Sequence, residues 1–169
     1  MKIFSGTSNI KIAEKIANLA GVPLGKIDLE TFSDGELRVA FQENIRGENV
    51  FLVQSTNPPA ENLMQLLLML DAAKRASAKT VTAVIPYYGY SRQDRKDQPR
   101  VPISARMIMD LMSAAGVDRM ITMDLHSPQI QGFTNVPFDN LYSRIVLFNK
   151  LKEYQLDVDN GVVLAPDIG

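Results

Sequence analysis

Short apolar runs alternate along the chain with longer segments in which apolar residues recur every three or four positions. The short runs predict buried strands at 2–4, 50–53, 81–85, 120–123 and 162–164. The longer segments predict helices between these strands. Because strands that alternate with helices form parallel sheets, the pattern predicts an α/β fold whose mainly parallel sheet is flanked by helices.

Residues typical of helix ends mark the first and third predicted helices. Ser8 or Asn9 can cap a helix that ends at Gly21, and Gly116 ends a later helix over about 108–115. A further helix is predicted where apolar residues recur at Leu141, Ile145, Phe148 and Leu151.

The longest apolar stretch of the chain lies in the second predicted helix. Asn57 before Pro58 predicts a cap and a first helical residue, with the helix continuing to about residue 76. Apolar residues at 63–70 go nearly all the way round this helix, which indicates a buried helix or a contact between subunits. Eight residues are too few to span a bilayer.

A hairpin excursion is predicted near residues 27–40. Ile27, Leu29 and Thr31 alternate with polar neighbours, and a turn at 33–35 precedes a second alternating run. On local evidence the turn is a type I′ hairpin turn with solvated acids at Asp34 and Glu36.

Composition narrows the range of functions. The 169 residues suit one domain, and a net charge of −1 provides no overall attraction for nucleic acid or an anionic membrane. The absence of cysteine excludes disulfides and thiolate chemistry, and the single histidine excludes a zinc site with several histidine ligands. We found no targeting or membrane-spanning segment, so we expect a soluble, cytoplasmic protein.

The loop after the strand at 81–85 is the first candidate site, since ligands of parallel α/β sheets bind beyond the carboxyl ends of strands. Residues 86–102 contain three tyrosines and a net charge of +2. Guanidinium groups suit phosphate, and tyrosine rings can stack on a base. The alternative is a solvated loop with ordinary surface charge. The charged residues are Arg92, Arg95, Lys96, Arg100, Asp94 and Asp97.

Two further strand-end loops contain candidate metal ligands. His126 follows the strand at 120–123, and Asp167 lies in the terminal PDIG segment. Either residue has an alternative structural role, the histidine as a satisfied polar group and the aspartate as part of a turn. Nothing matches the phosphate loop GxxxxGK[ST] or the dinucleotide fingerprint GxGxxG.

Four separated motifs together resemble the ribose-phosphate pyrophosphokinase family, the phosphoribosyl pyrophosphate synthetases. These are FSDGE at 32–36, SRQDRKD at 91–97, ITMDLHSPQIQGF at 121–133 and PDIG at 166–169. The resemblance implies two phosphoribosyltransferase-like domains, of which this chain is similar to the first. It also implies transfer of a diphosphoryl group from Mg·ATP to ribose 5-phosphate, with AMP as the other product.

The resemblance also implies roles for individual residues. A hairpin group, often across a subunit contact, would hold the adenine and ribose of ATP, and a loop group would bind ATP from the loop. His126 and Asp167 would hold Mg²⁺, and Arg92 and His126 would serve catalysis. The hairpin group is Phe32, Asp34, Gly35 and Glu36, and the loop group is Arg92, Gln93, Lys96 and Asp97.

One departure from the family pattern is large. The second domain normally supplies the sugar-phosphate loop with two adjacent acids, and the sequence contains no adjacent aspartate pair. We therefore expect a single domain over 1–169, part of a longer chain, that carries mainly the ATP half of the site. The family implies a homo-oligomer, a hexamer. The alternatives are a non-catalytic synthetase-associated regulatory protein and a nucleic-acid module that uses Tyr87, Tyr88 and Tyr90.

Overall fold

A five-stranded parallel sheet forms the centre of the molecule. The computed structural model describes residues 1–154 together with Val162 and Leu164. Neighbouring strands of the sheet are all parallel, which confirms the predicted α/β class. In spatial order the strands are β1 (Lys2–Ser5), β4 (Asn49–Val53), β5 (Thr80–Ile85), β6 (Arg119–Met123) and β7 (Phe138–Leu141).

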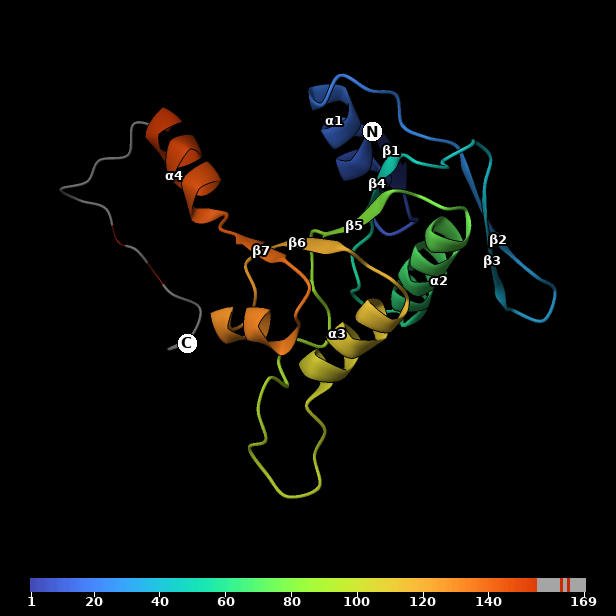
Figure 1. Cartoon of the computed structure of the whole chain (residues 1–169). Helices are drawn as coiled ribbons and strands as arrows, with labels where there is room; N and C mark the ends of the chain where they lie inside the picture. Colours follow the sequence, from blue (N-terminus) through green and yellow to red (C-terminus); the bar gives the residue numbers. More distant parts are fainter. Residues whose placement is uncertain (155–161, 163, 165–169) are drawn as a thin grey trace.

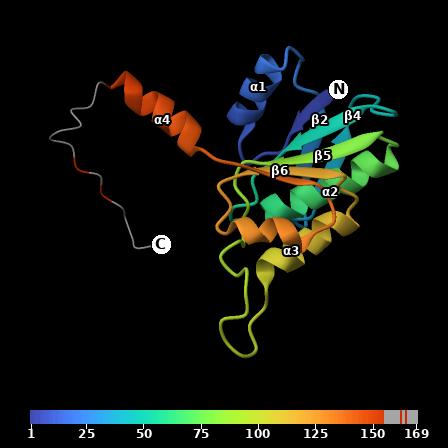
Figure 2. The same ribbon diagram turned by 60° about the vertical axis from the view of Figure 1, so that its left-hand side comes forward.

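Helices cover both faces of the sheet. Helix α1 lies on one face, and α2 and α3 lie on the other (Figures 1 and 2). Helix α4 extends from the end of β7 away from the sheet (Figure 1). The bounds are α1 (Ile10–Leu19), α2 (Glu61–Arg75), α3 (Ser104–Ala114), α4 (Arg144–Glu153) and a 3-10 helix, η1 (Pro128–Phe133).

The core follows the two-residue alternation of the strands. Ile3 and Val53 pack toward α1, whereas their neighbours Phe4 and Leu52 belong to the larger cluster that contains Leu66 of α2. Successive side chains of a strand point to opposite faces, so a strand that is apolar throughout serves both layers. The continuous apolar runs in the sequence therefore indicate a sheet covered on both sides.

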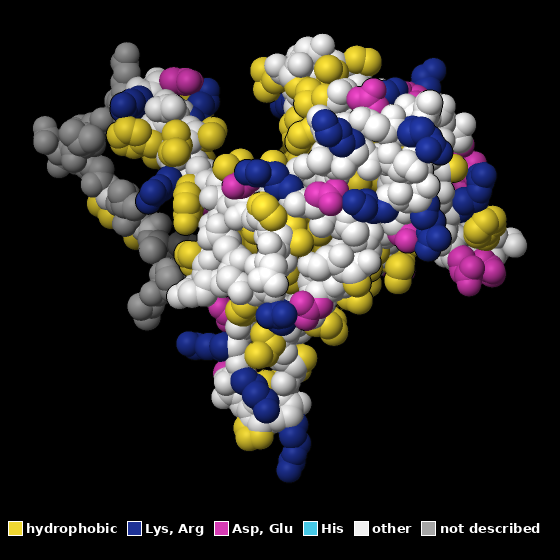
Figure 3. Space-filling view, in the orientation of Figure 1, with side chains coloured by type: hydrophobic (Ala, Val, Ile, Leu, Met, Phe, Trp, Pro, Cys, Tyr) yellow, Lys and Arg dark blue, Asp and Glu magenta, His cyan; other side chains and the backbone are white. Residues whose placement is uncertain are grey.

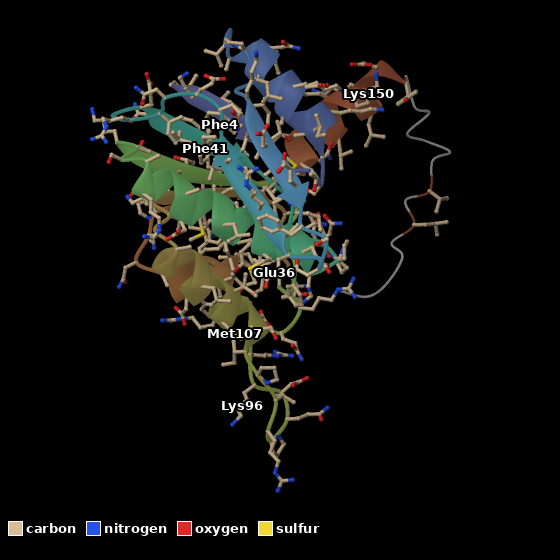
Figure 4. The ribbon with its side chains drawn as sticks, turned by 90° about the vertical axis from the view of Figure 1, so that its right-hand side faces the viewer. Phe4, Glu36, Phe41, Lys96, Met107 and Lys150 are labelled. Atoms are coloured by element: carbon tan, nitrogen blue, oxygen red, sulfur yellow. The ribbon has the colours of Figure 1, made fainter. Side chains whose placement is uncertain are left out.

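The predicted excursion is a separate two-stranded antiparallel sheet, β2 (Ile27–Thr31) and β3 (Leu37–Phe41). Its inner face packs on the main core, where Phe41 meets the ring of Phe4 edge to face at a centroid distance of 4.8 Å (Figure 4). The predicted type I′ turn is wrong, because that turn needs positive φ at two central residues and only Gly35 has it, at 95°. A three-residue loop closes the hairpin instead, with the Phe32 N–H donating to the Glu36 carbonyl.

The second helix begins later than predicted. Helix α2 starts at Glu61, and the side-chain amide nitrogen of Asn57 donates to the Pro58 carbonyl instead of capping the helix through its oxygen. A residue before proline is disfavoured in the helical region, and Pro58 precedes Pro59. Five apolar residues of the helix are buried, while Met64 on the opposite side is 52% exposed. The buried five are Leu63, Leu66, Met69, Leu70 and Ala73.

The sequence pattern does not predict β7. β7 contains only two apolar residues and carries Asp139, whose carboxylate pairs with Arg119 of β6 at 2.6 Å. Leu141, which we placed in the last helix, ends β7, and α4 begins three residues later. The strand predicted at 162–164 and the PDIG motif lie largely outside the described residues.

The first helix matches its prediction. Asn9 is the cap, and its side-chain oxygen accepts a hydrogen bond from the Ile12 N–H at 3.2 Å. Gly21 follows the helix with a φ of 69°, a conformation that glycine adopts at little cost. Among the described residues, none of the helices combines the length and apolar character that a membrane span requires.

Candidate functional site

The carboxyl ends of β5 and β6 bring two of the predicted loops together. Ile85 is in register with Thr122, so the loop after β5 and the loop after β6 leave the sheet at the same edge. The first runs from residue 86 to α3 and hangs below the helices in Figure 1. Lys and Arg side chains project from it in the space-filling view (Figure 3).

A cavity of about 300 Å³ lies between these two loops. The first loop contributes two arginines, two aspartates and a glutamine, and the second contributes the single histidine of the chain. Such a lining offers forked cationic donors and hard oxygen ligands in one place. The lining residues are Arg92, Gln93, Asp94, Arg95, Asp97 and His126.

A second hollow, of about 360 Å³, adjoins the same stretch of chain. Tyr87 and Tyr90 are 49% and 43% exposed there, beside Pro58, and Arg92 and Gln93 line both hollows. The Arg92–Gln93 segment therefore lies between a charged cavity and a surface with aromatic character. That arrangement suits a ligand with both phosphate and a flat ring.

Buried hydrogen bonds hold the base of the first loop to the rest of the fold. The Gly89 N–H donates to Thr56 Oγ1 at 2.8 Å, and the Thr56 N–H donates to the Tyr87 carbonyl at 2.9 Å. The Tyr88 hydroxyl donates to the Ala105 carbonyl at 3.0 Å, and Tyr88 is 3% exposed. Burial, with a smaller contribution from Asp110, raises the pKa of Tyr88, so this hydroxyl stays a donor at any physiological pH.

The histidine loop is held by hydrogen bonds to β7 and to the residues that follow β7. Asp124 adopts a φ of 48°, and its carboxylate accepts a hydrogen bond from the Ser143 N–H at 3.1 Å. The next N–H, that of Leu125, donates to Asn140 Oδ1 at 3.1 Å, and the Leu125 side chain is buried. These contacts leave His126 exposed at the cavity.

The structure does not bring the hairpin residues to this cavity. Phe32 is 52% exposed at the hairpin turn, and Asp34 accepts a hydrogen bond from the Glu36 N–H at 3.1 Å. In Figure 1 the hairpin lies beside α2, whereas the loop after β5 hangs below α3. None of Phe32, Asp34, Gly35 and Glu36 lines the cavity.

The remaining predicted site residues are Lys96 and Asp167. Lys96 lies on the part of the loop that extends away from the helices (Figure 4), and it is exposed outside the cavity lining. Asp167 lies outside the described residues. Within the described residues, no group of three or more His, Cys, Asp or Glu side chains is arranged to hold a metal ion.

The stacking role that the nucleic-acid alternative gave Tyr88 is wrong, because Tyr88 is buried and its hydroxyl is bonded to the Ala105 carbonyl. Thr56 and Ser104 also shape the site, and sequence reasoning missed both. Thr56 and Tyr88 anchor the loop, and Ser104 contacts Gln93 from the start of α3. Only Ser104 left a signal, as a small polar residue shortly after a proline where a helix begins. The contacts of Thr56 and Tyr88 join residues 17 to 33 positions apart, and no local pattern indicates them.

Comparisons with known proteins agree on one family. The model of the N-terminal domain of ribose phosphate pyrophosphokinase matches residues 1–116. The ribose-phosphate pyrophosphokinase of Chlorobaculum tepidum is 56% identical over 169 residues, which are 100% of this chain and 52% of that protein. The protein of the same name from Porphyromonas gingivalis is also 56% identical, over 99% of this chain and 53% of its own length.

A solved structure supports the same assignment. The phosphoribosylpyrophosphate synthetase of Mycobacterium smegmatis superposes with a TM-score of 0.87 at 40% identity, over 90% of this chain and 52% of that one. The chain thus spans about half the length of the relatives it matches. On the family model, the sequence identity and the shared fold, the chain belongs to the ribose-phosphate pyrophosphokinase family.

Proposed function

We propose that this chain forms the nucleotide-binding part of a ribose-phosphate diphosphokinase. The reaction transfers the diphosphoryl group of Mg·ATP to the anomeric hydroxyl of ribose 5-phosphate and gives phosphoribosyl pyrophosphate and AMP. The observation that supports this most is the cavity in which Arg92, Arg95 and His126 converge from two strand ends. The family of the chain fits the same chemistry.

The residues of the cavity match what such a transfer requires. The anomeric oxygen forms a bond to the β-phosphorus, the bond from that phosphorus to the α,β-bridging oxygen breaks, and AMP leaves with that oxygen. The hydroxyl proton passes to solvent. The protein then has mainly to neutralise charge and align the phosphates. Arg92 and Arg95 supply forked donors for this task, and Gln93 supplies a neutral one.

The oxygen groups at the cavity suit a magnesium ion that is bound together with the nucleotide. Mg²⁺ is commonly bound through one or two protein groups, with substrate phosphates and water as its other ligands, so no preformed protein cage is needed. Asp94 and Asp97 offer hard oxygens at the cavity beside His126. We propose that His126, together with Asp167, holds the ion, which when bound draws charge from the phosphate oxygens.

A second copy of the chain would complete the nucleotide site. We propose that Phe32, Asp34, Gly35 and Glu36 of a neighbouring subunit hold the adenine and ribose, because they are exposed and absent from the cavity of their own chain. A homo-oligomer follows from this arrangement. Light scattering that gave the mass of one chain at micromolar concentration would contradict it.

We propose that residues binding ribose 5-phosphate lie in the half of the relatives that this chain does not span. A cysteine-free composition supports a reducing, cytoplasmic setting.

Replacement of Arg92 by alanine tests the nucleotide site. Arg92→Ala should weaken Mg·ATP binding by about 1.5–3 kcal/mol, the range for a hydrogen bond to a charged group. Isothermal titration calorimetry measures the change directly. Arg75→Ala is the matched control, because Arg75 is an exposed arginine paired with Asp71 on α2, outside the cavity. Equal affinity in Arg92→Ala and the parent would contradict the proposal.

A further inference from the structure

The loop after β5 is fixed at its middle as well as at its base. The Gln93 carbonyl accepts a hydrogen bond from the Ala105 N–H at 3.1 Å, and Gln93 Oε1 accepts a second one from the Ser104 hydroxyl. Both donors belong to the first turn of α3. One residue of the loop is thus held to the helix by its main chain and its side chain together.

We infer that Ser104 is a positioning residue of the nucleotide site, one that holds Gln93 and through it the Arg92–Gln93 segment against the cavity. This role in nucleotide binding rests on the proposed function. Ser104 is 7% exposed and does not line the cavity, so it acts through Gln93. We call the contact between these two residues the Ser104–Gln93 clamp.

The clamp determines which face of the Gln93 amide is available. A glutamine side chain has one accepting oxygen and two N–H donors. The Ser104 hydroxyl occupies the oxygen, and the exposed Gln93 side chain therefore presents its Nε2 donors. Acceptors such as phosphate oxygens or the ring nitrogens of a purine match these donors. The clamp thereby selects the orientation in which Gln93 can donate to a nucleotide.

The clamp also divides the loop into two parts. Before it, Tyr88 and Gly89 are tied to α3 and to Thr56. After it, residues 94–102 make no hydrogen bond or ion pair with the rest of the described chain. The part that contains Arg92 and Gln93 is therefore preorganised. Residues 94–102, which we call the arm, are free to move without disturbing it. Preorganisation reduces the ordering cost of binding.

Limited digestion with trypsin tests the clamp without any ligand. The loop has cleavage sites after Arg92, Arg95, Lys96 and Arg100. Cleavage after Arg92 requires the clamped segment to open, whereas the sites of the arm do not. In Ser104→Ala, the initial rate of cleavage after Arg92, relative to that after Lys96, should rise about threefold to tenfold, which corresponds to one lost hydrogen bond. Mass spectrometry of the first fragments gives the ratio.

Two control variants and two variants of Gln93 complete this experiment. Ser104→Thr keeps the hydroxyl and should behave as the parent. Ser113→Ala removes a hydroxyl that donates to Met109 within α3, and it should also leave the ratio unchanged. Gln93→Ala alters an exposed residue, so the fold should tolerate it, and it should raise the ratio as Ser104→Ala does. The double variant should show no further rise, because both changes remove one contact.

The binding readout separates the clamp from the proposed function. Mg·ATP affinity should fall by about threefold to tenfold in Ser104→Ala and return in Ser104→Thr. An unchanged cleavage ratio in Ser104→Ala and Gln93→Ala would overturn the clamp. A raised ratio with unchanged Mg·ATP affinity would overturn the positioning role. If the parent bound no Mg·ATP, the proposed function would fail, and the cleavage ratios would still decide whether the clamp exists.

Discussion

The 169-residue chain, incubated with Mg²⁺, ATP and ribose 5-phosphate, should release AMP at least about 10⁵-fold more slowly than a full-length relative. Holding two reactants in line contributes roughly 7–11 kcal/mol to lowering a barrier. The chain spans 52% of the Chlorobaculum tepidum relative and contains no adjacent aspartate pair for the sugar-phosphate loop. The attacking hydroxyl would then meet the bound nucleotide by diffusion.

The assay needs protein whose mass confirms that it consists of these 169 residues. Full-length ribose-phosphate pyrophosphokinase from Chlorobaculum tepidum, measured in the same buffer, provides the reference rate. Sugar-dependent turnover near 1 per second, within the usual enzyme range, would show that these residues hold the whole site. The assignment of the sugar half to the remainder of the relatives would then be wrong.

Replacement of Gly89 by alanine should destabilise the fold by about 3 kcal/mol, the upper end of the cost of overpacking. A Cβ at this position would lie 2.0 Å from the Thr56 carbonyl oxygen and 2.8 Å from its carbon. Both atoms belong to the main chain, and the Thr56 N–H is itself bonded to the Tyr87 carbonyl. The clash therefore pushes apart the loops that leave β4 and β5. Urea denaturation measures the change.

Gly132→Ala is the matched control for this substitution. No atom lies within 4 Å of the position of a Cβ at Gly132, and its φ is not positive. Its free energy of unfolding should stay within about 0.5 kcal/mol of the parent, as for most surface changes. Equal stability of Gly89→Ala and Gly132→Ala would mean that the Gly89–Thr56 approach is not needed to hold the loop base.

Most of the sheet could be predicted because its inner strands are buried on both faces and are therefore rich in apolar residues. The exceptions have physical reasons. β7 is an edge strand with Asp139 and Asn140 at its centre. Because of these polar residues, its hydropathy pattern does not indicate a strand. The start of α2 depends on the Pro58–Pro59 pair, whose backbone restriction overrides the capping tendency of Asn57.

The part of the candidate site that depends only on the order of the strands could be predicted from the sequence. Loops that follow adjacent parallel strands meet at one edge, which is why Arg92 and His126 line one cavity although 34 positions separate them in the sequence. The Ser104–Gln93 clamp was not predictable, because it depends on how the loop returns to α3. The place of the hairpin residues depends on packing against α2, which the sequence pattern does not specify.

We expect Mg·ATP to bind beside His126, and the NMR signal of this side chain reports whether it does. Since the chain contains one histidine, its imidazole gives one assignable Cε1–H resonance. Titration with Mg·ATP should shift this resonance in a saturable manner, and Arg92→Ala should move the titration to higher concentration. A resonance that stays unchanged up to concentrations at which calorimetry shows saturated binding would place the nucleotide away from His126 and contradict the proposed site.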